Sequence, residues 1–249
     1  KISRNDSWMV GDSTSDIEAG RRAGLRTILI RTGHCGRDLK YAVRPDYIFP
    51  ELEEAVEWIL KGHAKMTSEL VAVATKLIDN KRVVLIGGLA RAGKSIVGQV
   101  LKELLGLLGH RPHLISLDGW LKPKSLRKEG SGVLERYDMR VVSTLLHETA
   151  NSKTRILLHE PIYDRFNGTH CDLKIEHSIG PNDILLVEGV PALMMDDLMA
   201  SPETILSLYV DVDPKVRTKR LAQDYAWRDN KNVDHLKVLE SRETDESPI

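Results

Sequence analysis

The chain of 249 residues carries 36 Lys and Arg residues against 36 Asp and Glu residues, so its formal net charge is zero. Such a balance gives no general attraction to nucleic acid or to an anionic membrane. Hydrophobic residues make up 41% and charged residues 29%, which excludes a wholly disordered chain. No apolar run approaches the roughly 18 residues that span a bilayer, and Cys35 and Cys171 cannot make a disulfide scaffold. We expect a cytoplasmic protein that binds neither nucleic acid nor membranes.

The two ends of the sequence resemble those of a fragment. The chain begins with Lys1 instead of Met, close to an apolar strand, and stops at Ile249 without a clear closing element. We therefore expect it to be part of a longer protein.

The first segment alternates short apolar strands with helices. A helix over 15–23 is predicted to start at Ser15 as its N-cap and to stop at Gly24, and helical spacing of apolar residues continues over 52–60. Strands are predicted at 8–10, 27–30 and 47–49. This alternation indicates a parallel sheet. We place the domain boundary at Gly62-His63, which gives domains 1–63 and 64–249.

The second segment shows the same alternation on a larger scale. An amphipathic helix over 65–80 opens it. Strands are predicted at 83–86, 113–117, 155–158, 184–187 and 206–210, and helices at 94–108, 141–146 and 215–228, the last with Pro214 at its first position. Residues 119–136 are typical of a surface loop, and residues 163–182 are predicted to be irregular or hairpin-like. The pattern predicts an α/β fold with a parallel sheet flanked by helices.

A glycine-rich loop follows the first strand of this segment. The sequence GLARAGKS over Gly88–Ser95 fits the Walker A pattern G-x-x-x-x-G-K-[ST] at every fixed position, between a strand and a helix. Such loops hold nucleotide phosphates with backbone N–H groups and the positive end of the helix. Lys94 would reach the β- and γ-phosphates, and the Ser95 hydroxyl would bind Mg²⁺. The predicted nucleotide contacts are Gly88, Leu89, Ala90, Arg91, Ala92, Gly93, Lys94, Ser95 and Ile96.

Two acids follow neighbouring strands. Asp118 comes after 113–117, and Glu188 after 184–187. Because ligands of open α/β sheets bind at the carboxyl ends of the strands, both carboxylates are expected to face the phosphate loop. One would hold Mg²⁺, and the other would accept the proton of an attacking hydroxyl. The alternative is that each acid only caps a helix.

Residues ~80–230 resemble the uridine kinase, pantothenate kinase and phosphoribulokinase group of P-loop kinases. The resemblance implies a P-loop NTPase-type parallel sheet, with Asp118 as catalytic base near Mg²⁺ and with Ser95 and Glu188 around the metal. It also implies that Tyr137, Asp138 and Tyr163 face the phosphate acceptor. The matching segments, in the family's order, are Gly88–Ser95, Ile115–Trp120, Glu135–Asp138, Pro161–Asp164, Asp183–Gly189 and Tyr209–Asp213.

The basic helix over 215–228 would form the lid of such a kinase. Its arginines would close over the phosphates and neutralise charge that develops in transfer, or they would simply line a solvated helix face. The candidates are Arg217, Arg220 and Arg228. The family usually has an arginine before the lid aspartate, but Gln223 precedes Asp224 here, so the identity of the main lid arginine stays open. The loop around Trp120 also departs from the nucleoside-binding pattern, which argues against a uridine kinase.

The first segment contains a second acidic pair. Asp12 follows a strand and Asp16 lies in the next helical turn, so the two carboxylates could share one Mg²⁺ or simply favour the helix start. Residues ~5–62 resemble the last motif of haloacid-dehalogenase (HAD) phosphatases, closest to the histidinol-phosphate and heptose-bisphosphate phosphatase branch. The resemblance implies a partial Rossmann-like HAD segment. That family's nucleophilic D-x-D motif lies upstream of this region, so we expect no phosphatase activity from this segment alone.

The sequence thus predicts an enzyme that uses ATP and Mg²⁺ to phosphorylate a hydroxyl of a small molecule, such as a sugar, a sugar phosphate or a nucleoside-like compound. The kinase would be fused to an incomplete phosphatase half. Two alternatives remain: a P-loop NTPase that couples hydrolysis to conformational change, and a non-catalytic nucleotide-binding module that regulates the attached phosphatase. ATP turnover without an acceptor would favour the NTPase, whereas the presence of both Asp118 and Glu188 argues against a non-catalytic module.

Overall fold

In a computed structural model the chain forms two compact units, Lys1–Leu70 and Val71–Ile249. The structure describes residues 3–4, 6–77, 82–128, 131–198 and 205–227. The predicted domain boundary at residue 63 coincides with the start of helix α3 (His63–Leu77), and the two units divide inside this helix. Within these described ranges, every helix is too short or too polar to cross a bilayer.

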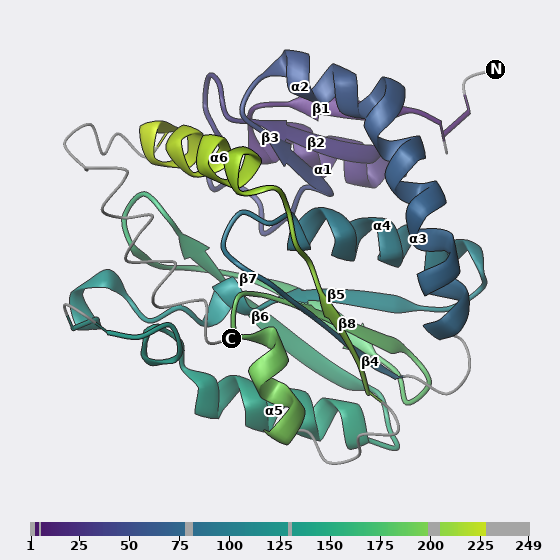
Figure 1. The fold of residues 1–249 in the computed structure, drawn as a ribbon, viewed down its shortest axis with the longest axis vertical. Coiled ribbons are helices and arrows are strands. Elements are labelled where there is room, and N and C mark those ends of the chain that lie inside the picture. Colours follow the sequence, from purple (N-terminus) through teal and green to yellow (C-terminus); the bar gives the residue numbers. More distant parts are fainter. Residues whose placement is uncertain (1–2, 5, 78–81, 129–130, 199–204, 228–249) are drawn as a thin grey trace. The chain divides into compact units, whose positions relative to one another are not determined.

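The first unit contains a parallel sheet in the order β1-β2-β3, as predicted from the alternation of elements. Its elements, labelled in Figure 1, are β1 (Trp8–Gly11), α1 (Thr14–Ala23), β2 (Arg26–Ile30), β3 (Tyr47–Phe49), α2 (Leu52–Glu57) and a π-helical turn, η1 (Trp58–Gly62), that runs into α3. Trp8, Tyr47 and Trp58 gather around His63, whose ring centroid lies 5.2, 6.0 and 5.8 Å from theirs. This aromatic cluster joins the sheet to the helices that follow it.

The N-cap of helix α1 lies two residues earlier than predicted. Its N-cap is Ser13 instead of Ser15, because the Ser13 hydroxyl accepts the backbone N–H of Asp16 at 3.2 Å while the Asp16 carboxylate accepts that of Ser13 at 3.2 Å. This capping box satisfies two N–H groups at the helix start. The predicted stop at Gly24 is confirmed, since Gly24 has a φ of 72°, a conformation that glycine adopts without strain.

The second unit is built on a parallel sheet in the order β5-β8-β4-β9. The strands are β4 (Val83–Gly87), β5 (Pro112–Ser116), β8 (Ile184–Glu188) and β9 (Ile205–Tyr209). In the register of the sheet Glu188 lies opposite Ser116 on one side and Ile86 on the other. The carboxyl ends of β4, β5 and β8 therefore lie level at one edge of the sheet.

Helices cover both faces of this sheet (Figure 1). Successive residues of a strand point to opposite faces: Val83 and Leu85 of β4 pack into the large core cluster with Val142 of α5 (Met139–Asn151). On the other face α4 (Lys94–Leu107) approaches closely, since a β-carbon at Gly98 would lie 2.8 Å from Leu114 Cδ1. This confirms the predicted α/β class.

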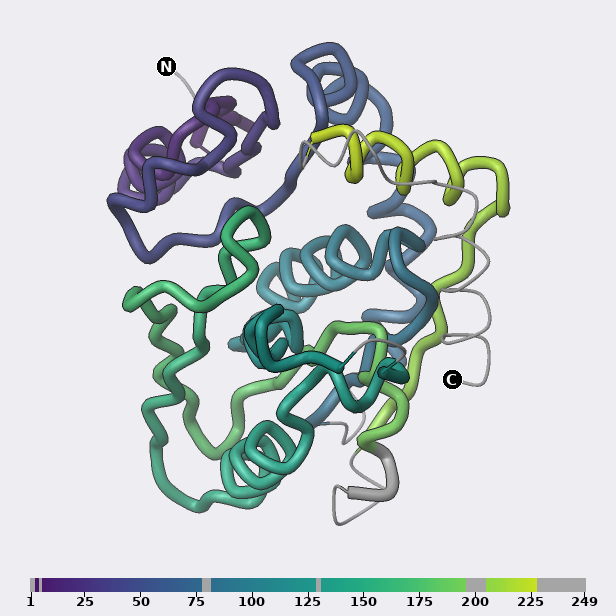
Figure 2. The backbone as a smooth tube through the Cα atoms, turned by 90° about the vertical axis from the view of Figure 1, so that its left-hand side faces the viewer, coloured from purple at the N-terminus to yellow at the C-terminus, as the bar shows by residue number. Residues whose placement is uncertain are grey.

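An antiparallel hairpin, β6 (Ile156–Asp164) with β7 (Thr169–Ile179), completes the core of this unit. In Figure 2 its strands appear as two adjoining green segments. Leu158 and Ile179 are buried in the same cluster as the sheet. The hairpin interpretation of residues 163–182 is thus correct, and the irregular one is not. The remaining described elements are η2 (Leu117–Trp120), η3 (Lys124–Leu126), η4 (Leu134–Arg136), η5 (Ala192–Leu198) and helix α6 (Pro214–Trp227).

Candidate functional site

The phosphate loop runs from the end of β4 to the start of α4 in the position that the motif requires. Gly88 has a φ of 136°, and a β-carbon there would lie only 2.3 Å from the carbonyl oxygen of Val210. Gly93 has a φ of 109° and serves as the N-cap of α4. Residues with a side chain rarely adopt these angles. The two fixed glycines of the motif are therefore demanded by the local backbone.

The start of α4 is suited to an anion. No side chain caps the helix, and its first turn contains no acidic residue. The first N–H groups of a helix have no partner within the helix, and the macrodipole makes this end positive. A phosphate at this point would accept those N–H groups.

Lys94 brings a positive charge to the loop. Its side chain is buried, and its ammonium group donates to the carbonyl oxygens of Gly88 at 2.9 Å and Leu89 at 2.8 Å. The amine thus lies against the loop main chain, within reach of a phosphate that the same loop would hold.

Asp118 lies in η2, the turn that follows β5. The Tyr137 hydroxyl donates to its Oδ1 at 3.3 Å, and Arg165 forms an ion pair with its Oδ2. Burial would raise the pKa of Asp118, but the charges of Arg165, Lys94 and Arg91 outweigh this effect and hold the pKa below its ordinary value. Asp118 is therefore ionised at neutral pH. Its side chain remains 36% exposed, so a ligand can reach it.

Glu188 ends β8 and is buried. Its charge acts on both groups that contact Asp118. Burial and the charge of Asp118 raise the pKa of Tyr137, and Glu188 adds to this effect. Asp118 is the main cause of the raised pKa of Arg165, and Glu188 again adds to it. Lys94 in turn acts on Asp118. Lys94 therefore lies within electrostatic range of Asp118, and Glu188 lies within range of the two groups that contact Asp118.

The oxygen donors at this edge of the sheet would suit Mg²⁺, which takes few protein ligands, better than a metal ion that is bound by protein side chains alone. Magnesium usually keeps several waters and takes one or two protein oxygens together with substrate phosphates. Ser95 is exposed at the helix start, and Glu188 ends the adjacent strand. Among the described residues no group of three or more His, Cys, Asp or Glu side chains is placed to hold a metal ion.

The predicted acceptor-binding residues take different positions. Tyr137 is buried beside Asp118, and burial together with that carboxylate raises its pKa well above the ordinary value. Tyr163 accepts a hydrogen bond from Arg127 at 2.5 Å and packs against His170, which in turn is 2.9 Å from the carbonyl oxygen of Gly119. Both tyrosines therefore lie around the Asp118 turn.

Asp138 is less directly placed. Its carboxylate is exposed at the N-cap of α5, while its backbone N–H donates to the carbonyl oxygen of Trp120 at 2.9 Å. The main chain at Asp138 thus braces the Asp118 turn.

Helix α6 is tied to the phosphate loop. Arg217 is buried and its Nε donates to the carbonyl oxygen of Ala90 at 3.2 Å, while Arg220 donates to that of Arg91 at 3.2 Å. Asp224 on the same helix forms an ion pair with Arg91. Two predicted lid arginines therefore hold the loop main chain. The third, Arg228, lies outside the described residues.

Two residues of the site were missed at the sequence level. Arg165 pairs with Asp118 across 47 positions of sequence. The fully buried Glu160 accepts the backbone N–H of Ser116 at 3.1 Å and lies 2.9 Å from His177 Nε2. The only signal for either was their position beside the quoted Pro161–Asp164 segment.

In the first unit the two predicted metal ligands serve the local backbone. The Asp12 carboxylate accepts the backbone N–H of His34 at 2.6 Å, and the Asp16 carboxylate accepts the Ser13 hydroxyl at 2.8 Å within the capping box. These contacts correspond to the helix-start alternative for Asp16. A shared magnesium site stays a prediction.

Comparison with known proteins gives different results for the two segments. Residues 1–55 match the family model described as HAD-hydrolase-like. A D-glycero-D-manno-heptose-1,7-bisphosphate 7-phosphatase from Chlorobaculum tepidum is 39% identical over 64 residues, which are 25% of this chain and 32% of that protein. Its counterpart from Thermosynechococcus vestitus is 47% identical over 57 residues, 21% of this chain and 29% of that protein. The chain thus spans about a third of the length of these relatives.

Among solved structures, a proposed fructose transport system kinase from Silicibacter sp. TM1040 matches with a TM-score of 0.53 and 18% identity, over 71% of this chain and 89% of that one. At this identity the likeness shows the fold alone. The resemblances predicted from the sequence, to HAD-type phosphatases in the first segment and in fold to small-molecule kinases in the second, are therefore confirmed.

Proposed function

We propose that the second unit catalyses ATP-dependent phosphoryl transfer to a hydroxyl group of a small molecule. The observation that carries this proposal is the meeting of three elements at one sheet edge: an uncapped helix start behind the glycine loop, the buried amine of Lys94, and the ionised carboxylate of Asp118. A nucleotide-binding module without chemistry would need the first two, but not a reachable carboxylate beside them.

In the proposed reaction the loop amides and Lys94 hold the triphosphate so that its γ-phosphorus faces Asp118. The acceptor hydroxyl attacks phosphorus, a new O–P bond forms, and the bond to the β–γ bridging oxygen breaks, so that ADP leaves. Asp118 accepts the hydroxyl proton and returns it to solvent. Catalysis of this kind rests on positioning and charge neutralisation more than on covalent steps. When bound, Mg²⁺ would neutralise the phosphate oxygens, with Ser95 and Glu188 around it.

A sugar or sugar phosphate is the acceptor class that we favour. The support comes from the first segment, whose curated relatives are phosphatases of a heptose bisphosphate by name. Enzymes joined in one chain often act on related compounds, but this is an association between domains and not a physical argument. In this proposal the phosphoryl transfer belongs to the second unit.

The proposal is tested by an acceptor screen. The full chain is incubated with ATP and MgCl₂, and ADP release is followed with sugars, sugar phosphates, nucleosides and pantothenate added singly. We expect release to rise strongly with at least one sugar or sugar phosphate. Steady ADP release that no compound increases would instead indicate an NTPase, and no release under any condition would leave only a binding module.

A further inference from the structure

Arg165 contacts the group that the proposed reaction uses as its base. It lies in the turn after β6, and its guanidinium forms an ion pair with Oδ2 of Asp118, while Oδ1 accepts the Tyr137 hydroxyl. Both oxygens of the base are thus engaged in the structure. A hydroxyl can hand its proton to Asp118 only where one of these contacts gives way or moves aside.

The arginine is presented by a braced turn. Asp164 Oδ1 accepts the backbone N–H of Phe166 at 2.8 Å, and the Phe166 ring packs edge-on against Trp227 of α6 at a centroid distance of 4.3 Å. These contacts fix the main chain on either side of Arg165, whereas its side chain is still 31% exposed. The guanidinium is therefore held by a fixed main chain and remains partly exposed to solvent.

The neighbouring arginines are engaged differently. Arg217 and Arg220 donate to carbonyl oxygens of the phosphate loop, and Arg91 pairs with the buried Asp224 of α6. Those contacts maintain the loop and would be lost if the side chains moved. Arg165 pairs instead with a reachable carboxylate, in range of the charges of Glu188 and Asp224, and a phosphoryl group beside Asp118 offers it a second anionic partner of higher charge.

We propose that Arg165 binds the γ-phosphoryl group of ATP during transfer, releasing Oδ2 of Asp118 to accept the hydroxyl proton. This inference rests on the proposed function. The exchange breaks no covalent bond: one ion pair is replaced by another, and the positive charge follows the phosphoryl group as the negative charge develops on it. The hairpin β6–β7, and not α6 alone, would then supply a catalytic residue of this site.

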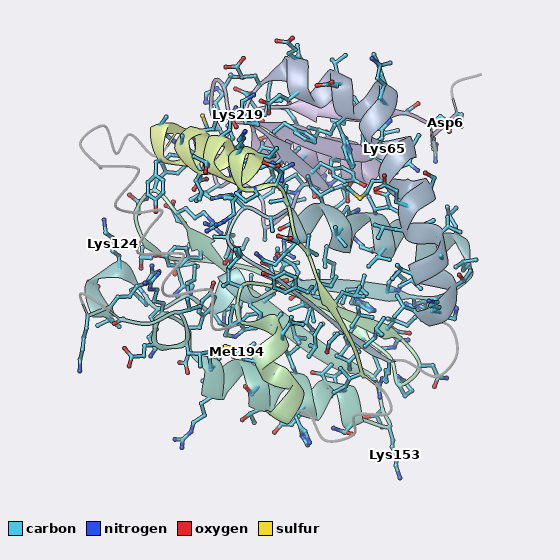
Figure 3. The ribbon with its side chains drawn as sticks, in the orientation of Figure 1. Asp6, Lys65, Lys124, Lys153, Met194 and Lys219 are labelled. Carbon is cyan, nitrogen blue, oxygen red and sulfur yellow. The ribbon has the colours of Figure 1, made fainter. Side chains whose placement is uncertain are left out.

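The test compares two nucleotides that differ by the γ-phosphate. Affinities of the full chain for ADP and for an ATP analogue with nitrogen between the β- and γ-phosphates are measured by titration calorimetry with MgCl₂ present. Arg165→Gln removes the charge and Arg165→Lys keeps it without the forked donors. The matched control is Arg155→Gln. Arg155 immediately precedes β6, at the opposite end of that strand from Arg165. Figure 3 labels Lys153, two residues before Arg155, at the far edge of this unit.

We expect Arg165→Gln to weaken binding of the ATP analogue by roughly tenfold or more, because a charge-assisted hydrogen bond to the γ-phosphate is lost. The affinity for ADP is expected to stay within about twofold of the wild-type value. Arg165→Lys is expected to fall between Arg165→Gln and the wild type, and Arg155→Gln to match the wild type. An unchanged ratio of the two affinities in Arg165→Gln, with ADP still bound, would overturn this inference and leave the proposed function standing. A wild type that binds neither nucleotide would overturn both.

Discussion

Glu160 links the hairpin to strand β5, which leads into the turn that contains Asp118. Its side chain is fully buried, Oε1 accepts the backbone N–H of Ser116 at 3.1 Å, and Oε2 is 2.9 Å from His177 Nε2. Ser116 lies two residues before Asp118 in the sequence. We predict that Glu160→Ala destabilises the second unit and misplaces Asp118.

The size of the effect follows from these contacts. The alanine variant leaves two buried groups without this partner, and each costs about 1–3 kcal/mol, so that a loss of about 3 kcal/mol is expected. For a unit of this size about 1 kcal/mol lowers the melting temperature by about 2–4 °C, which gives about 6–12 °C. Glu160→Gln keeps an oxygen acceptor for one of the two groups and is expected to lose about 2–4 °C.

Differential scanning calorimetry of the full chain checks this prediction. The chain has two compact units, so the relevant transition is the one that added ADP raises. Glu176→Gln on β7 is the control, because the Glu176 side chain is 66% exposed and its ion pair with His159, at 3.7 Å, contributes little. A Glu160→Ala variant that melts within 2 °C of the control, where about 6–12 °C is expected, would show that the buried contacts do not carry the stated energy.

Three further outcomes follow from the site. Lys94→Ala should abolish phosphoryl transfer, measured as ADP release, and should lower the melting temperature modestly while the unit stays folded, because the carbonyl oxygens of Gly88 and Leu89 lose its ammonium group; unchanged turnover in the folded variant would refute the kinase site. Gly88→Ala should lose nucleotide binding in titration calorimetry, because its β-carbon would lie 2.3 Å from the Val210 carbonyl oxygen at a φ of 136°; wild-type affinity would contradict the loop geometry. Because Arg165 and Lys94 outweigh burial and hold the pKa of Asp118 below its ordinary value, kcat/KM should stay flat as pH falls from neutral and drop only in strong acid. An acid limb near neutral pH that moves with Asp118→Glu would contradict the assignment.

Local patterns accounted for much of this architecture. The runs at 83–86 and 184–187 are buried strands, as their continuous apolar sequence predicted, and the phosphate loop lies between strand and helix. The strand-end positions of Asp118 and Glu188 were enough to place both at one edge, because carboxyl ends of parallel strands coincide. The strands, the loop and the two acids could be predicted because each depends on neighbouring residues or on the common direction of parallel strands.

Contacts between distant segments could not be read in the same way. Arg165 pairs with Asp118 only because strand β6 of the hairpin packs against η2, the turn that contains Asp118, and no local sequence pattern predicts that contact. The strand over 169–179 alternates less exposed and exposed residues from Cys171 to Ile179, but His177 takes one of the less exposed positions, so the alternation of apolar and polar residues is incomplete in the sequence. The start of α1 was misplaced because Ser13 and Ser15 are equally good caps in sequence, and Asp16 at the third helical position decides between them.

The most direct test of the account follows the γ-phosphate itself. ATP labelled at this phosphate is incubated with the full chain, MgCl₂ and an acceptor found in the screen, and the products are separated. The account predicts label in a phosphomonoester of the acceptor, with none transferred by Asp118→Asn. Label that appears only as inorganic phosphate, at equal rates with and without the acceptor, would contradict it.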